Sequence, residues 1–212
     1  SVKATNTGSN QTFDDASTSN HTITAAGDTT ASTFSPHRHG GYSAYFDGSG
    51  DYLSLASNVI SIPSSTEFTI ECWVNFTDIG SYEMLFGGTG NNPYFCVRKD
   101  NSVEFAIAGS YAYFPWDAIN NNNTWYYVTI VRNSTNIIKL WIDGVEVTAT
   151  SGANQTGAVP IVNIGRVDGF PQHDFQGYIS DFKVDVGHAR YSSNFTPPTS
   201  PSVADSNTTF LL

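Results

Sequence analysis

The chain has 212 residues, of which 14% are aromatic and only 13% are charged, and its formal net charge is −10. This length can bury the core of one all-β domain. Nucleic acids and anionic membranes are bound through Lys and Arg, so the acidic balance argues against both as partners.

The first 36 residues are rich in Ser, Thr and Asn and contain two short strand-like pieces. Apolar and polar positions then alternate over 42–46, which predicts a strand. Residues 47–51 (DGSGD) are typical of a turn, and the alternation resumes over 52–55. We therefore expect a hairpin at this point of the chain.

The longest clean alternation lies at 68–76, where every second residue is apolar. This pattern predicts a core strand with one buried face. Further along, 94–98 and 103–107 have strand character and are separated by Lys-Asp-Asn-Ser. We expect these two segments to form a second hairpin.

The clearest pattern in the chain runs from Trp125 to Val147 and predicts three consecutive antiparallel strands. A polar turn separates the first two strands. Asp143-Gly144 separates the second from the third, and this dipeptide favours a type I′ turn with positive φ at both positions.

After this meander, strands are expected at 161–164 and 176–186, around a loop at 166–174. We take residues 1–190 as one domain. Residues 191–212 contain three closely spaced prolines, and we expect an extended tail that lies over the surface and leads to the next part of a larger protein. Many short strands without helices predict an antiparallel two-sheet sandwich.

The two cysteines, Cys72 and Cys96, each lie inside a strand-like run. Buried free thiols are the simpler interpretation. A cross-strand disulfide stays open, because the sequence does not give the distance between the two strands.

Four segments occur in an order and spacing that resemble one family: FDGSGDYLSL, FTIECWVNF, WYYV with LWIDGVEV, and IGR followed by FQGYISDFKV. Together they resemble a laminin G-like module of the concanavalin A-like lectin/glucanase superfamily, over about residues 12–186. The resemblance implies a jelly-roll of two antiparallel sheets, and a binding or structural role more often than catalysis. Other phrases, such as ARYSSNFTPPTSP, resemble modules of phage tail-fibre and capsid-appendage proteins and of bacterial surface proteins.

Glycosidases of this superfamily carry Glu-x-Asp-x-x-Glu, which places two carboxylates on one face of a strand beside the scissile bond. The motif is absent here, and no glutamate has an acidic neighbour two positions later. No serine lies in a Gly-x-Ser-x-Gly context either. We therefore expect a protein that is not an enzyme.

Calcium is the metal that the sequence favours, as a structural ion. Hard cations bind oxygen, and loops rich in Asp and Asn supply it. Many laminin G-like modules carry one calcium. Turn formation is an equally good explanation for Asp47, and Asp181 lies in an apolar strand where it needs a metal or an Arg as partner. The candidate ligands are Asp14, Asp47, Asp51 and Asp181.

A carbohydrate site needs exposed aromatic rings that stack on a sugar, bracketed by side chains that bind hydroxyl groups. Three loop regions offer such groupings, although most aromatic residues in this chain must belong to the core. The candidate residues are Tyr94, Tyr111, Tyr113, Trp116, Asn122, Phe170 and His173. Trp73 and Trp141 lie in mid-strand and are expected to fill the sheet face opposite the aliphatic one.

The leading hypothesis is a non-catalytic recognition module that binds host-surface or environmental glycans. It would lie on a virion surface or outside the cell and contact a receptor or neighbouring modules. The alternative is a structural module, such as a capsid or tail decoration or a fibre-forming repeat. Such a module would act through protein–protein contacts without binding sugar.

Overall fold

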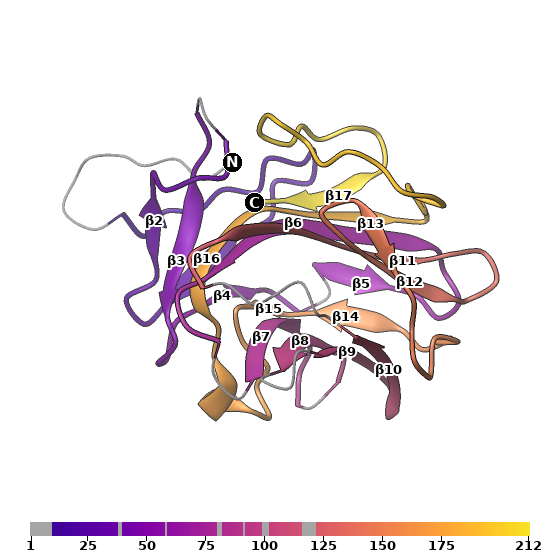
Figure 1. Cartoon of the computed structure of the whole chain (residues 1–212). Coiled ribbons are helices and arrows are strands. Elements are labelled where there is room, and N and C mark those ends of the chain that lie inside the picture. The colour runs from indigo at the N-terminus through magenta and orange to yellow at the C-terminus, as the bar shows by residue number, and fades with distance from the viewer. Residues whose placement is uncertain are drawn as a thin grey trace.

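The computed structural model describes residues 10–37, 40–57, 59–79, 82–90, 92–98, 102–115 and 122–212. Two large antiparallel sheets pack face to face, and Figure 1 shows them edge-on as an upper and a lower layer. Apart from one 3-10 turn, η1 (Pro171–His173), the regular elements of these residues are strands. None of the described helical segments is long and apolar enough to cross a membrane. The predicted all-β jelly-roll sandwich is confirmed.

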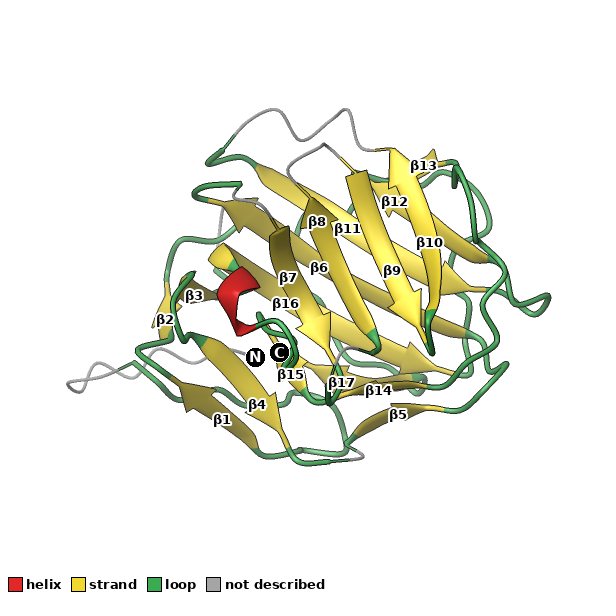
Figure 2. Cartoon of the chain, turned by 90° about the horizontal axis from the view of Figure 1, so that it is seen from below, coloured by secondary structure: helices red, strands yellow, loops and turns green. Residues whose placement is uncertain are grey.

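The lower sheet has seven strands in the order β1-β4-β15-β7-β8-β9-β10. Figure 2 looks at this sheet from below, with η1 beside β7. The strands are β1 (Ile23–Ala26), β4 (Tyr52–Leu55), β15 (Asn163–Ile164), β7 (Tyr82–Gly87), β8 (Tyr94–Arg98), β9 (Ser102–Ile107) and β10 (Ser110–Pro115).

The upper sheet has eight strands in the order β13-β12-β11-β6-β16-β3-β2, and β17 pairs with β16. A small third sheet pairs β14 with β5. The strands of the upper sheet are β13 (Val145–Val147), β12 (Ile138–Ile142), β11 (Trp125–Arg132), β6 (Phe68–Phe76), β16 (Gln176–Val186), β3 (Ser43–Asp47), β2 (Thr30–Ser32) and β17 (Thr208–Leu211). Those of the third sheet are β14 (Val159–Ile161) and β5 (Ile60–Ile62).

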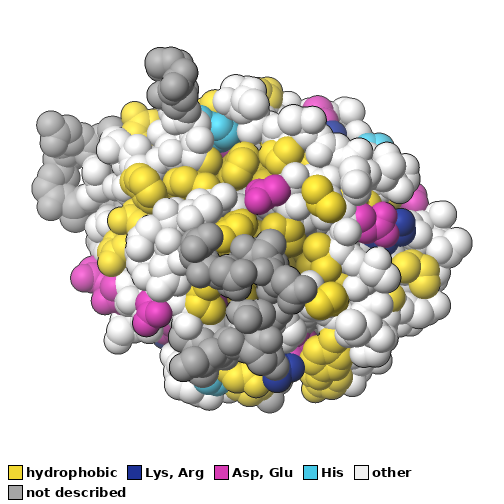
Figure 3. Space-filling view, in the orientation of Figure 1, with side chains coloured by type: hydrophobic (Ala, Val, Ile, Leu, Met, Phe, Trp, Pro, Cys, Tyr) yellow, Lys and Arg dark blue, Asp and Glu magenta, His cyan; other side chains and the backbone are white. Residues whose placement is uncertain are grey.

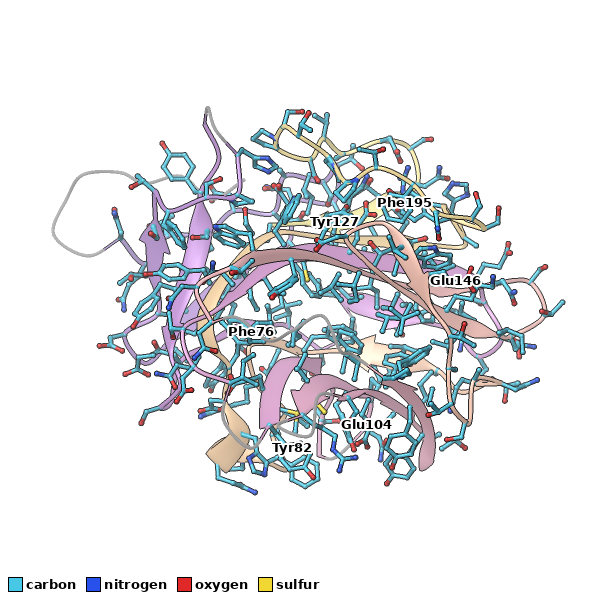
Figure 4. All side chains as sticks on the ribbon, viewed as in Figure 1. Phe76, Tyr82, Glu104, Tyr127, Glu146 and Phe195 are labelled. Carbon is cyan, nitrogen blue, oxygen red and sulfur yellow. The ribbon has the colours of Figure 1, made fainter. Side chains whose placement is uncertain are left out.

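Strict alternation in the central strands builds the core between the sheets. In β6, Phe68, Val74 and Phe76 are completely buried and belong to the main hydrophobic cluster. Figure 4 shows Phe76 between the two layers. Successive side chains point to opposite faces, so the intervening residues of β6 lie on the outer face. The expected core strand at 68–76 is confirmed.

The predicted meander over 125–147 is also confirmed. β11 pairs with β12, and β12 pairs with β13, all antiparallel. Asp143 has φ 51° and Gly144 has φ 78°, the positive values that a type I′ turn requires. Asp143 Oδ1 also accepts a hydrogen bond from the Tyr127 N–H at 2.8 Å, which ties the turn to β11.

The hairpin expected around residues 47–51 is wrong. β3 lies in the upper sheet and β4 in the lower one, so the chain changes sheets at this turn. Phe46 and Leu53 are both completely buried, which requires the two strands to face one core from opposite sides. The sequence period is the same for a hairpin and for such a corner, and therefore did not distinguish them.

The expected extended tail at 191–212 is only partly observed. The segment after β16 crosses the outer face of the upper sheet, visible above that sheet in Figure 1, and then returns as β17. Phe210 and Leu212 are buried in the core, and the Leu211 N–H donates to Asp15 Oδ1 at 3.0 Å. Residues 208–212 therefore belong to the domain, because their apolar side chains close one part of its core.

Both cysteines are buried free thiols, as expected. Cys72 lies in β6 of the upper sheet and Cys96 in β8 of the lower sheet. Burial raises the pKa of the Cys72 thiol, which keeps it protonated. The disulfide alternative is thereby excluded.

Candidate functional site

The outer face of β7, β8, β9 and β10 carries a second, smaller group of buried side chains. The strand register places Met84, Cys96, Glu104 and Tyr113 in one row across these four strands. Because neighbours in register point to the same side, the whole row faces away from the main core. Figure 4 shows Glu104 and Tyr82 on this side of the lower sheet.

This face holds an open pocket of about 410 Å³. Its walls combine aromatic rings with hydrogen-bonding and charged groups, the composition of small-molecule sites. The lining residues are Tyr82, Met84, Tyr94, Arg98, Glu104, Tyr113, Phe170, Gln172 and His173.

One of the residues that line the pocket is a fixed polar group. Glu104 is only 4% exposed, and its carboxylate accepts a short hydrogen bond from the Tyr94 hydroxyl and another from Arg98 Nη1 at 3.3 Å. Burial, together with the hydrogen bond to Glu104, raises the pKa of the Tyr94 hydroxyl, so it remains a donor. The Glu104 carboxylate is thus held in one orientation before any ligand arrives.

The Arg98 guanidinium lies near two tyrosine rings. Its central carbon is 5.5 Å from the centroid of Tyr82 and 5.9 Å from that of Tyr113. Such cation–π contacts hold the planar group in place while part of it stays open to solvent. About a quarter of the Arg98 side chain is exposed (26%), which leaves it accessible from the pocket.

The segment around η1 closes one side of the pocket. Asp174 forms a parallel bridge with Met84, and the rings of His173 and Tyr82 are 4.6 Å apart. Asp174 is fixed in turn by Arg166, whose Nε donates to Asp174 Oδ1 at 2.7 Å. These contacts of Asp174 hold the η1 segment against β7. Phe170, which precedes η1, is thereby held beside a pocket whose other walls are mainly strands.

The structure brings together four of the seven predicted glycan residues: Tyr94, Tyr113, Phe170 and His173 line the pocket. Tyr111 lies next to it, with its ring stacked on that of Tyr113 at 6.3 Å and its side chain 41% exposed.

The other two predicted residues are not part of this group. Asn122 is exposed in the loop before β11 and does not line the pocket. Trp116 lies outside the described residues.

Sequence reasoning did not select Tyr82, Arg98 or Glu104 as binding residues. The sequence did contain a signal for two of them, Arg98 and Glu104. A hairpin that pairs Arg98 with Ser102 places Glu104 diagonally opposite Arg98 on the same face. Tyr82 is placed by the pairing of β7 with β8. The Gly-rich stretch 87–90 predicts a turn between these strands, but the register shift between Met84 and Phe86 has no signal in the sequence.

A second cluster lies at the corner between β3 and β4. Asp28, Asp47 and Asp51 each offer a carboxylate oxygen, and these atoms lie within 4.8 Å of one another. Asp51 is buried and accepts hydrogen bonds from the N–H groups of Asp28 and Asp47, at 2.8 and 2.9 Å. Burial raises the pKa of Asp51, and the charge of Asp47 raises it further. Three carboxylates in this arrangement fit the oxygen ligands that calcium requires.

Two predicted metal ligands lie elsewhere. Asp181 is bonded to His37 Nε2 at 2.6 Å, so its partner is an imidazole where we expected a metal or an Arg. Asp181 lies at a β-bulge in β16 and has φ 52°. The bulge interrupts the alternation of side chains along the strand, so this acidic residue does not occupy one of the apolar positions. Asp14 forms an isolated bridge with Thr22 and is not part of the three-carboxylate cluster.

Residues 47–185 match the sequence profile of the concanavalin A-like lectin/glucanases superfamily. The match spans well over half of the chain, and the chain belongs to this superfamily. No curated protein matches the sequence.

Three solved structures that are similar to this chain have low sequence identity to it. The binding domain of Paraclostridial mosquitocidal protein 1 is 14% identical, with TM-score 0.57, over 82% of this chain and 46% of that one. The receptor-binding domain of a botulinum neurotoxin C/D mosaic serotype is 16% identical, with TM-score 0.54, over 84% and 44%. A heptameric SAP-like pentraxin from Limulus polyphemus is 16% identical, with TM-score 0.46, over 58% and 65%. This chain therefore spans less than two thirds of each of these proteins.

Proposed function

We propose that this chain is a non-catalytic recognition module that binds carbohydrate in the pocket on β7–β10. One observation carries the proposal: aromatic rings and fixed polar groups from β7, β8, β9, β10 and the η1 segment converge in one open pocket. A sugar ring presents apolar C–H faces and a rim of hydroxyl groups, and this pocket offers a partner for each. Solved relatives by fold include a binding domain and a receptor-binding domain, which agrees with such a role.

The roles of the side chains follow from their positions. Tyr113 and Phe170 supply ring faces for stacking. Glu104 accepts hydrogen bonds, and Arg98 and Gln172 donate them to hydroxyl oxygens. Because Tyr94 and Arg98 already orient the carboxylate, little side-chain entropy is lost when a sugar binds.

The same geometry argues against glycoside hydrolysis in this pocket. Hydrolysis of a glycosidic bond uses two carboxyl groups that face each other across it. Among the described residues that line the pocket, Glu104 is the only carboxylate, and it is already bonded to Tyr94 and Arg98. The proposed role is therefore binding without turnover.

We place this module on a virion surface or outside the cell, where it would bind glycans of a host surface or of the environment. This setting rests on the resemblance of the sequence to modules of phage appendages and bacterial surface proteins. Neighbouring modules and a receptor complete the proposed set of partners.

Replacing Tyr113 or Phe170 by alanine is expected to lower affinity for the bound glycan at least tenfold, about 1.4 kcal/mol, because each variant removes one stacking face. Neither residue belongs to the main core, so the melting temperature should stay close to that of wild type. Isothermal titration calorimetry measures the affinity. Val203→Ala is the matched control, because Val203 is 78% exposed and lies outside the pocket. Unchanged affinity in both pocket variants would contradict the proposal.

We further propose that Asp28, Asp47 and Asp51 hold a structural calcium ion. Burial raises the pKa of Asp51, so the stability that this group contributes is present below its unfolded pKa and is lost as pH rises through its folded pKa. At pH 7 three ionised carboxylates repel one another, and calcium would relieve that repulsion.

Calcium is therefore expected to raise the melting temperature at pH 7, and to raise it less at pH 4. The gain is about 2.7 kcal/mol when free calcium is 100 times the dissociation constant. Thermal unfolding in calcium and in EDTA measures it, and Asp28→Asn should abolish the difference. Identical curves for wild type in calcium and in EDTA at pH 7 would rule the ion out.

A further inference from the structure

A row of large side chains crosses the outer face of the upper sheet, on the side of the sandwich opposite the pocket. The register pairs Trp125 of β11 with Asn75 of β6, Asn75 with Tyr178 of β16, and Tyr178 with Tyr45 of β3. These four residues therefore lie side by side on one face, pointing away from the core.

Phe34, in the loop after β2, lies on top of this row. Its ring centroid is 4.8 Å from that of Tyr178 and 5.3 Å from that of Trp125, and 45% of the residue is exposed. Tyr45 and Tyr178 are also in ring contact, at 4.9 Å. We call Phe34, Tyr45, Trp125 and Tyr178 the Phe34 cluster. Figure 3 shows hydrophobic side chains at the surface on the side of the molecule where β2 and β3 run in Figure 1.

Unpaired polar atoms lie within this cluster. Asn75 is completely buried, and neither its amide nitrogen nor its amide oxygen has a hydrogen-bond partner among the described residues. The indole N–H of Trp125 is buried as well and has no partner in the part of the chain that the structure describes. A buried amide without partners destabilises a fold, and native structures retain few such groups. These donors and this acceptor, surrounded by rings, have the features of a ligand-binding site.

The charges near the cluster restrict the ligand. No cation lies over a ring of the cluster among the described residues. An anionic ligand is therefore disfavoured, and a neutral one with many hydroxyl groups fits both the rings and the amide.

We propose that the Phe34 cluster is a second carbohydrate-binding site, which takes a neutral saccharide. The rings receive the C–H face of the sugar, and the Asn75 amide and the Trp125 indole N–H bind hydroxyl groups. Phe34 covers Asn75 and must turn aside. Its backbone stays fixed, because its N–H donates to Ser32 Oγ at 3.0 Å and its carbonyl accepts from Ser43 Oγ at 2.6 Å. Only the side chain has to change rotamer.

This site does not depend on the pocket on β7–β10. With both sites occupied, one domain would hold two saccharides on opposite faces of the sandwich and could link two glycan chains. Each site can fail independently in an experiment, because the two share no residues.

The test is affinity electrophoresis of the purified domain in gels that contain neutral polysaccharides (galactomannan, xyloglucan or starch). We expect wild type to be retarded by at least one of them. Asn75→Ala should weaken that retardation at least tenfold, whereas the pocket variant Tyr113→Ala retains it. Val145→Ala is the matched control, because Val145 is 58% exposed on β13, away from both sites.

Melting curves separate binding from folding. Asn75→Ala removes only unpaired polar atoms, so its melting temperature should lie within a few degrees of wild type. Several results would overturn the proposal: no retardation of folded wild type in any gel, retardation that only Tyr113→Ala abolishes, or full retardation of Asn75→Ala. A change of tryptophan fluorescence with a proline-rich peptide, and none with the three polysaccharides, would assign these rings to a peptide and also overturn it.

Discussion

Replacing Arg132 by alanine is expected to lower the free energy of unfolding by about 3–5 kcal/mol, the usual cost of breaking a buried charged network. For a chain of this size that corresponds to a fall in melting temperature of roughly 6–20 °C. Arg132 is completely buried at the end of β11, and its guanidinium donates to main-chain carbonyl oxygens in two separate loops. The acceptors are Thr66 at 2.7 Å, Pro63 at 2.7 Å, Gly157 at 2.5 Å and Gln155 at 3.4 Å.

The loss is large because alanine leaves these buried carbonyl groups unpaired and separates the loop at 63–66 from the loop at 155–157. Arg132→Lys should recover little, since an ammonium group cannot match the planar fork of a guanidinium. Lys139→Ala is the control for loss of a surface cation, because its ion pair with Glu146 is partly exposed and contributes less than about 1 kcal/mol. A fall of less than 2 °C for Arg132→Ala, measured by calorimetry, would contradict the role given to this network.

Trp141→Ala is expected to cost about 3–5 kcal/mol of stability, the range for removing a large buried aromatic side chain. Trp141 is completely buried, although it lies on the outer face of the upper sheet. The segment after β16 covers it: the rings of Tyr191 and Phe195 lie 6.3 and 6.4 Å from its own. Figure 4 shows Phe195 beside Tyr127 above this sheet.

Trp141→Phe is the informative control. It keeps most of the apolar contact and removes an indole N–H that has no partner among the described residues, so it should cost much less than the alanine variant. Denaturant unfolding measures both variants. A wild-type unfolding curve for Trp141→Ala would show that the segment after β16 does not form a packed layer on the sheet.

Local patterns predicted the central strands well. The period-2 alternation of β6 and the Asp143-Gly144 turn are short-range signals, and each specifies one geometry. The prediction that Trp73 and Trp141 face away from the aliphatic side also agrees with the structure, since both lie opposite the core-facing residues of their strands.

Long-range features could not be predicted in the same way. The corner at 47–51 reads like a hairpin, because alternation does not say which sheet the next strand joins. The return of β17 depends on pairing with β16, and its few apolar residues follow a polar stretch. Both the corner and the pairing of β17 depend on tertiary contacts, which leave no signal in the local sequence.

The candidate pocket could be predicted only in part, because local sequence shows which side chains have suitable chemistry but not which of them meet. Tyr94, Tyr113, Phe170 and His173 were selected because they are aromatic residues next to turns. Their convergence depends on the strand register and on the bridge between Asp174 and Met84, which joins segments 90 residues apart. Sequence pattern thus identified side chains of the right chemistry, and the fold decides which of them meet.

The most direct test of the central claim is a glycan-array screen of the soluble domain beside its Tyr113→Ala variant, in calcium and again in EDTA. We expect wild type to bind at least one glycan whose signal the folded Tyr113→Ala variant loses, whereas any signal from the Phe34 cluster should persist in that variant. If the signal persists in EDTA, the pocket side chains alone are sufficient for binding. If it is lost in EDTA, binding also requires calcium at the three-carboxylate cluster. A folded wild-type domain that binds no glycan in either buffer, or a variant that keeps every signal, would contradict the account.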